Sequence, residues 1–98
     1  MKKSKGNINT GIVWYTEVEW KKMKKISIDS ERLENSFQEW KEIAQKTLSN
    51  MKATGLVGEK VFIKSEEFLI WCKIHSLPVD ASSRSRYVSE IMSRRNSN

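Results

Sequence analysis

The chain has 98 residues, with 18 Lys and Arg against 12 Asp and Glu and a formal net charge of +6. That length gives one small domain, and no stretch approaches the roughly 18 apolar residues of a membrane span. A lone cysteine cannot form an internal disulfide, and the positive N-terminus has no apolar stretch behind it, so a secreted protein is disfavoured. We expect a cytoplasmic protein with a flexible basic tail over 1–10, one globular domain over 11–94 and a flexible tail over 95–98.

Two elements are predicted before residue 28. GIVWYT, at 11–16, is β-branched and aromatic, which is typical of a short strand or of an extended lead-in. Thr16 and Glu19 have the spacing of a capping box, in which the hydroxyl and the carboxylate each accept a backbone N–H. A first helix is therefore predicted over TEVEWKKMKKIS, with its glutamates at the start and its lysines at the end.

The strongest pattern is the apolar stripe of a long helix. Its positions are spaced by four, three, four, three and four residues: Leu33, Phe37, Trp40, Ala44, Thr47 and Met51. Such spacing marks one face of an amphipathic helix, and Gly55 supplies the left-handed residue that commonly ends one. The pattern predicts a helix over 33–54 as the spine of the domain, with Asp29 or Ser30 as its cap.

After Gly55 the period changes to that of a strand. Val61 and Ile63 alternate with lysines and with Phe62, which predicts a strand over 60–64. A strand needs a pairing partner. Here the partner is either GIVWY in the same chain or the same strand in a second copy, and the second option predicts a homodimer.

A third helix is predicted to follow at once. Ser65 has the character of its cap, and its apolar side includes Trp71, Cys72 and His75. Leu77 and Pro78 close it, because the residue before a proline is disfavoured in a helix.

The last element is a helix that Asp80 begins, DASSRSRYVSEIMSRR. Its inner stripe is Tyr87, Val88, Ile91 and Met92, and its arginines are left to the surface. The whole order predicts an α+β fold, a mostly helical small domain with one long central helix and a minor short-stranded sheet.

Several aromatic motifs recur along this order: Trp14-Tyr15, Trp20, Phe37-x-x-Trp40, Gly55, Trp71-Cys72 and the series Asp80, Arg84, Tyr87. In these motifs the chain resembles a scattered set of small bacterial proteins of unassigned function. The resemblance covers roughly residues 13–92 and implies an α+β architecture, with no reaction, cofactor or partner. Those proteins usually have Gly where Ser76 stands, a departure that concerns the tightness of the turn at 76–79.

Cys72 and His75 are the residues with the most reactive side chains. They lie three apart in a helix, so a thiol and its base could meet. Against this, a thiol in an apolar stripe is normally buried and inert. A zinc site would need about four ligands, from Asp80 or Glu66 or from a second subunit. We therefore expect both residues to be structural, with no catalytic residue, no metal and no cofactor.

Binding surfaces are the remaining candidates. Aromatic residues are favoured at protein interfaces, and the candidate interaction surface is Trp14, Tyr15 and Trp20. Basic residues could hold a nucleic-acid backbone, and the candidates are Lys21, Lys22, Lys24, Lys25, Arg84, Arg86, Arg94 and Arg95. The loop at 76–81 also has about the length found in a helix-turn-helix. The sequence favours a non-enzymatic protein–protein interaction module, and nucleic-acid binding is the alternative.

Overall fold

The computed structural model describes residues 8–95, so most of the predicted flexible tails over 1–10 and 95–98 lies outside the described residues. Its elements in chain order are β1 (Ile8–Trp14), α1 (Glu17–Ile26), the 3₁₀ turn η1 (Ser30–Arg32), α2 (Phe37–Ala53), β2 (Leu56–Phe62), α3 (Ser65–Ile74) and α4 (Ala81–Arg95). Every predicted helix and strand is present. The strand β1 begins at Ile8 and the helix α4 ends at Arg95, so regular secondary structure reaches into both segments predicted as tails. Within residues 8–95, no helix combines the length and the hydrophobicity needed to cross a membrane.

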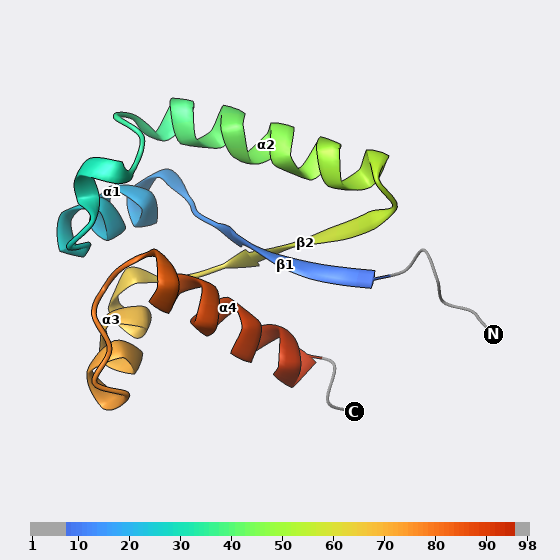
Figure 1. The fold of residues 1–98 in the computed structure, drawn as a ribbon. Helices are drawn as coiled ribbons and strands as arrows, with labels where there is room; N and C mark the ends of the chain where they lie inside the picture. Colours follow the sequence, from blue (N-terminus) through green and yellow to red (C-terminus); the bar gives the residue numbers. More distant parts are fainter. Residues whose placement is uncertain (1–7, 96–98) are drawn as a thin grey trace.

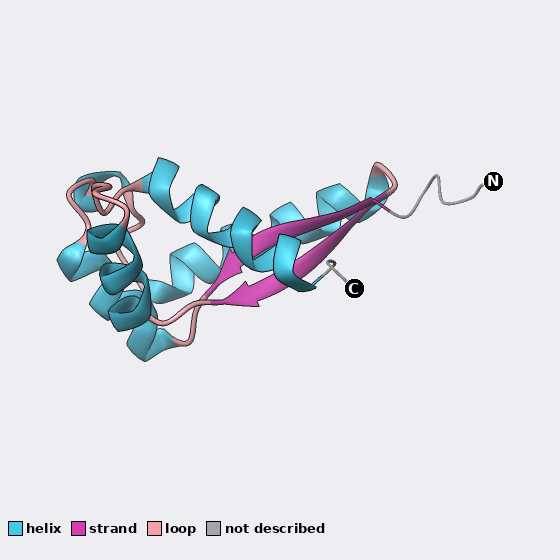
Figure 2. Cartoon of the chain, turned by 90° about the horizontal axis from the view of Figure 1, so that it is seen from below, coloured by secondary structure: helices cyan, strands magenta, loops and turns pink. Residues whose placement is uncertain are grey.

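The two strands lie side by side and run parallel, in register from Ile8 opposite Leu56 to Trp14 opposite Phe62. Helix α2 covers one face of this sheet and α4 covers the other, as Figure 1 shows. Helices α1 and α3 lie at the ends to which the strands point (Figure 2). The described part of the chain is thus a small α+β domain. The prediction of one long central helix is not confirmed, because α2 is the longest helix, with 17 residues, but lies on the outside of the sheet.

Two glycines allow the helices to pack closely on the strands. A Cβ atom on Gly11 would lie 2.5 Å from the Cγ of Met92 in α4, and one on Gly58 would lie 2.5 Å from a Cδ of Leu48 in α2. Gly11 therefore faces α4, and Gly58 faces α2. A glycine inside a strand often marks such a close approach of two elements.

The long helix begins four residues later than predicted, at Phe37. The Ser36 hydroxyl accepts the N–H of Glu39 at 3.1 Å, and the Glu39 carboxylate accepts the N–H of Asn35 at 3.3 Å. This local capping arrangement fixes the first turn, and the chain before it forms η1 instead. The predicted helix end is confirmed, since Gly55 has a φ of +88°.

The predicted interaction surface of Trp14, Tyr15 and Trp20 is wrong. These side chains are only 4%, 5% and 3% exposed. Trp14 and Tyr15 each pack edge-on against Trp40 of α2, with ring centroids 5.2 and 5.1 Å apart, and Trp20 packs against Phe37 at 6.3 Å. The aromatic residues at the start of the domain are core residues because α2 brings its own aromatic pair to them.

The predicted capping box of α1 is half correct. The Thr16 hydroxyl accepts the N–H of Glu19 at 3.2 Å, but the Glu19 carboxylate turns away from its own helix. It accepts the backbone N–H and the hydroxyl of Ser65, at 2.7 and 3.0 Å. Glu19 therefore caps α3 across the domain, and Ser65 is the first helical residue rather than the predicted cap. The hydrogen bond from the Ser65 backbone is the main reason that the pKa of Glu19 lies below its usual value.

Candidate functional site

The outer edge of β1 carries main-chain groups that the sheet does not use. Ile63 N–H donates to Trp14 C=O at 3.2 Å, so the main-chain groups of Trp14 point toward β2. Alternation along a parallel strand directs those of Asn9, Gly11 and Val13 the opposite way. Within residues 8–95, no backbone hydrogen bond outside the helices and the β1–β2 ladder reaches these groups.

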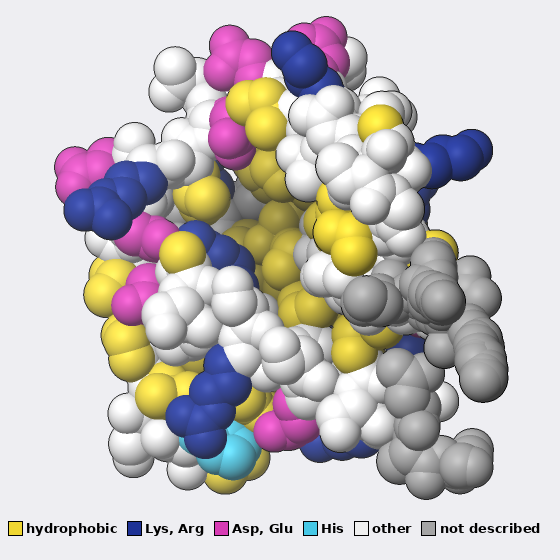
Figure 3. Space-filling model, turned by 45° about the vertical axis from the view of Figure 1, so that its right-hand side comes forward, with side chains coloured by type: hydrophobic (Ala, Val, Ile, Leu, Met, Phe, Trp, Pro, Cys, Tyr) yellow, Lys and Arg dark blue, Asp and Glu magenta, His cyan; other side chains and the backbone are white. Residues whose placement is uncertain are grey.

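This edge lies between two hollows. The first, called here the α2-side hollow, has a volume of about 340 Å³ and lies between β1 and α2, lined by Ile12, Trp40, Ile43, Ala44 and Thr47 among others. The second, the α4-side hollow, has a volume of about 400 Å³ and lies between β1 and α4, lined by Gly11, Ser85, Val88, Ser89 and Met92 among others. Both hollows include Val13 and Ser85 among their lining residues, so they adjoin each other along the edge, and the two together are called the groove here. Figure 3 looks into a depression with hydrophobic side chains at its floor.

Three of the residues that line the α2-side hollow have ionisable side chains: Tyr15, Glu34 and Arg84. Burial raises the pKa of Tyr15 to about 12, so its hydroxyl is neutral and can donate a hydrogen bond at physiological pH. The Glu34 carboxylate has no hydrogen bond or ion pair within residues 8–95. Its backbone carbonyl, by contrast, accepts from Lys24.

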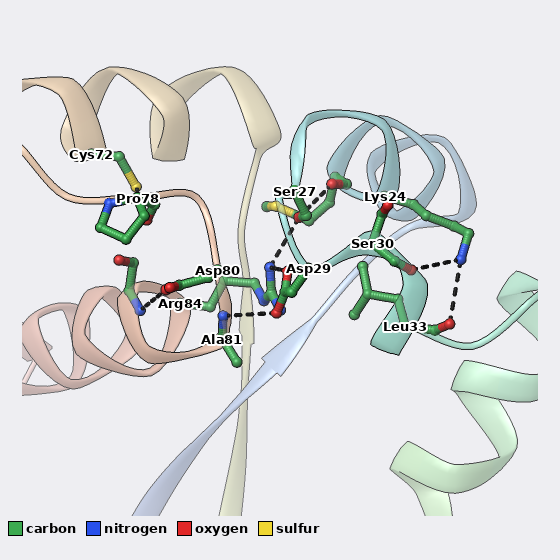
Figure 4. Close-up of polar contacts among 12 residues, drawn as sticks. Lys24, Ser27, Asp29, Ser30, Leu33, Cys72, Pro78, Asp80, Ala81 and Arg84 are labelled. Atoms are coloured by element: carbon green, nitrogen blue, oxygen red, sulfur yellow. Dashed lines mark hydrogen bonds and ion pairs between the residues drawn. The ribbon is translucent and has the colours of Figure 1, made fainter.

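Arg84 is buried, with 7% of its surface exposed, so its prediction as a surface contact for nucleic acid is wrong. Its guanidinium makes a bidentate pair with Asp29, at 2.8 and 3.3 Å, and donates to the Ser27 hydroxyl at 2.9 Å (Figure 4). Burial alone would raise the pKa of Asp29, but the hydrogen bonds and charge of Arg84 outweigh it and hold that pKa below its usual value. The pair ties the start of α4 to the segment after α1.

Asp29 has a second bond that the sequence did not predict. Its carboxylate accepts the N–H of Ala81, the first residue of α4, at 3.1 Å, while Asp80 accepts the N–H of Ser83 at 3.0 Å. Asp80 therefore caps α4 as predicted. Asp29 or Ser30 was expected to cap the long helix, but Ser36 is its cap and the Asp29 carboxylate accepts from the start of α4 instead.

Most of the other predicted nucleic-acid contacts have partners within the protein. Lys24 donates from Nζ to the carbonyls of Ser30, Leu33 and Glu34, at 3.1, 3.3 and 2.9 Å. Four more are in ion pairs within residues 8–95: Lys21 with Glu17, Lys22 with Glu19, Arg94 with Glu90 and Arg95 with Glu59. Lys25 and Arg86 are exposed.

These basic residues are also divided between two helices. Helix α1 packs against α2 and α3, whereas α4 packs mainly against β1 and α3. The structure does not gather them into one surface, and nucleic-acid binding stays a prediction.

Cys72 is buried, as predicted, with 1% of its surface exposed. Its thiol donates to the Pro78 carbonyl at 3.7 Å, and burial raises its pKa. His75 is exposed rather than on the buried side of its helix, because it is the C-cap residue of α3, and its ring packs on Trp71 with centroids 4.7 Å apart. Within residues 8–95, no three His, Cys, Asp or Glu side chains are grouped to hold a metal ion.

The groove was not predicted from the sequence, although one signal points to it. Gly11 stands inside a β-branched and aromatic run, and such a glycine marks a close approach to another element. The sequence does not show that this element is α4 or that the strand edge stays open, because both depend on contacts between residues distant in sequence. Comparison with family models, curated proteins and solved structures gave no match to this chain.

Proposed function

We propose that this chain is a small, non-enzymatic, cytoplasmic protein that acts by binding an extended segment of another protein along β1. The segment adds a third strand to the sheet, next to Asn9, Gly11 and Val13. Its backbone pairs with the outward main-chain groups of these residues, and its side chains alternate between the two hollows.

The observation that carries the proposal is the open edge of β1 at the floor of a groove. Strand addition uses an edge of this kind, in which main-chain hydrogen bonds give affinity and flanking pockets select alternate side chains. Successive side chains of a strand point to opposite faces of the sheet. A hollow on each face of β1 matches that alternation.

The recessed position of the edge also restricts the occupant. Residues of α2 line the hollow on one side of it, and residues of α4 line the hollow on the other side. A single strand without flanking helices enters such a groove. Two β1 edges from two copies are both recessed and do not reach each other, so the occupant is a strand from a different protein.

Selection from a displayed library of random octapeptides, with the full chain as bait, tests this function. We expect selected peptides to shift the amide signals of Gly11 and Val13 in nuclear magnetic resonance spectra of the chain. Asn9→Pro removes an outward N–H and leaves the ladder intact, because proline is tolerated at the outward positions of edge strands. It should weaken binding about tenfold, the effect of losing one well-formed hydrogen bond.

Asn9→Ala is the matched control, since it removes the same side chain and keeps the N–H. Its affinity should equal that of the unaltered chain. The proposal is wrong if no peptide is selected, if selected peptides shift other surfaces and leave β1 unchanged, or if Asn9→Pro binds as well as Asn9→Ala.

A further inference from the structure

We propose that the α2-side hollow is the anchor pocket for one side chain of the bound strand, and that this side chain is an aromatic ring bearing a hydrogen-bond donor, a tyrosine or a tryptophan. The inference rests on the proposed function and names the chemistry of the partner. It follows from the register of the groove, from the shape of the hollow and from its polar end.

The register places one partner side chain over this hollow. Gly11 faces α4, as its contact with Met92 requires, and alternation turns the neighbouring Ile12 toward α2. Consistent with this, Ile12 lines the α2-side hollow and lies 3.2 Å from the place of a Gly58 Cβ. Side chains directly opposite each other on paired strands share a face. The partner residue opposite Ile12 therefore enters the α2-side hollow.

The hollow suits one large ring. Its volume of about 340 Å³ lies at the small end of ligand pockets. Its walls are mainly apolar, and they include the aromatic rings of Tyr15, Trp20 and Trp40. Rings in such a setting are stabilised by edge-to-face packing beyond their buried area.

The polar end of the hollow favours a bound side chain that donates a hydrogen bond. Only Glu34 and Arg84 carry charge among its lining residues. The charge of Arg84 is neutralised by Asp29, which leaves the half-buried Glu34 carboxylate as an acceptor without a partner within residues 8–95. A phenol O–H or an indole N–H can donate a hydrogen bond to this carboxylate. A lysine or arginine fits less well, because its charge would lose water on entering a hollow with mainly apolar walls.

Side-chain fragments test the pocket without the strand. p-Cresol and 3-methylindole represent tyrosine and tryptophan, and toluene represents phenylalanine. We expect the first two to shift the methyl signals of Ile12 and Ala44 with dissociation constants about tenfold lower than that of toluene, since a hydrogen bond to a charged group adds that much. Glu34→Ala should abolish the difference. Glu31→Ala, which removes an exposed carboxylate outside this hollow, should preserve it.

The peptide selection provides a second test of the anchor pocket. Peptides that align on β1 should share a tyrosine or tryptophan at one position, and changing that tyrosine to phenylalanine should weaken binding about tenfold in the unaltered chain and little in Glu34→Ala. Peptides that align on β1 without this preference would overturn the anchor and leave the proposed function standing. Fragments that bind with the expected preference, in a chain that selects no strand, would retain the pocket and remove the proposed function. Equal binding of toluene and p-cresol contradicts the anchor directly.

Discussion

Among single residues, Arg84 makes the contact on which two distant segments depend. Its guanidinium fits Asp29 in the bidentate geometry that lysine cannot reproduce, and both side chains are largely buried. Breaking one partner of such a pair leaves a buried charge without compensation. We expect Arg84→Lys to lower the free energy of unfolding by about 2–4 kcal/mol in urea denaturation. Arg86→Lys, two residues along and exposed, should change it by less than about 0.5 kcal/mol.

The same pair predicts how stability depends on pH. The pKa of Asp29 is lower in the folded protein than its ordinary value, so the unfolded chain binds the proton more readily. Its contribution to stability is therefore complete above the unfolded pKa of about 3.9, and it is lost as the pH falls through the lower, folded pKa. Asp29→Asn should flatten the fall in stability below about pH 4. An unchanged acid profile would contradict the assignment.

The backbone conformation of Ser76 predicts that a substitution at this position can stabilise the protein. It has a φ of +55° and is the one non-glycine residue with a positive φ among the described residues. A side chain in the left-handed region costs about 1–2 kcal/mol, a cost that glycine does not have. Ser76→Gly should raise the free energy of unfolding by about 1 kcal/mol after the entropy of glycine is counted. Gly55→Ser, at a φ of +88°, should lower it by a similar amount, and a loss in both variants would refute the argument.

At the scale of elements, the types of helix and strand follow from the sequence because each depends on local periodicity. The stripe from Phe37 to Met51 belongs to α2, and the alternation around Val61 belongs to β2. A predicted helix boundary was wrong where nearby polar side chains cap the helix at another residue, as Ser36 and Glu39 do at the start of α2. The roles of Glu19 and Arg84 were missed for a different reason. Their partners, Ser65 and Asp29, are 46 and 55 residues away, and no local pattern reports such pairs.

Lys24 holds the connection between α1 and α2. Its ammonium donates to three backbone carbonyls of the segment from Ser30 to Glu34 and lies 5.7 Å from the centre of the Trp20 ring. These carbonyls precede the capped start of α2. Lys24 therefore holds in place the segment that forms part of the wall of the α2-side hollow. Lys24→Met should lower the free energy of unfolding by about 2 kcal/mol and speed hydrogen exchange over residues 30–36.

Lys25→Met is its matched control, because Lys25 is an exposed neighbour in the same helix turn. It removes the same charge and should leave both the stability and the exchange rates nearly unchanged. Equal effects of the two substitutions would show that net charge, rather than the carbonyl contacts, is what matters.

At the scale of the whole molecule, the sheet has a second open edge, along β2. The premise of the predicted homodimer was a strand without a partner in its own chain, and β1 supplies that partner. Within residues 8–95, however, the main-chain groups of Gly58 and Lys60 on the outer edge of β2 have no backbone partner, by the same alternation that leaves β1 open. Apolar side chains stand beside this edge: Val57 is 44% exposed and Phe62 is 59% exposed. Exposed apolar edge strands favour pairing with another copy.

We therefore expect a dimer that joins two β2 edges about a two-fold axis, the commonest symmetry of small proteins. Sedimentation at micromolar concentration should give a mass of twice the 11.5 kDa chain. Phe62→Lys should return it to the monomer by placing a charge at the joined edges. Ile74→Lys is the control, because Ile74 is 73% exposed on α3, away from either edge, and it should leave the dimer intact. Since the groove along β1 is a different edge, the selected octapeptides should bind dimer and Phe62→Lys monomer alike, and a single 11.5 kDa species at every concentration would rule out the dimer.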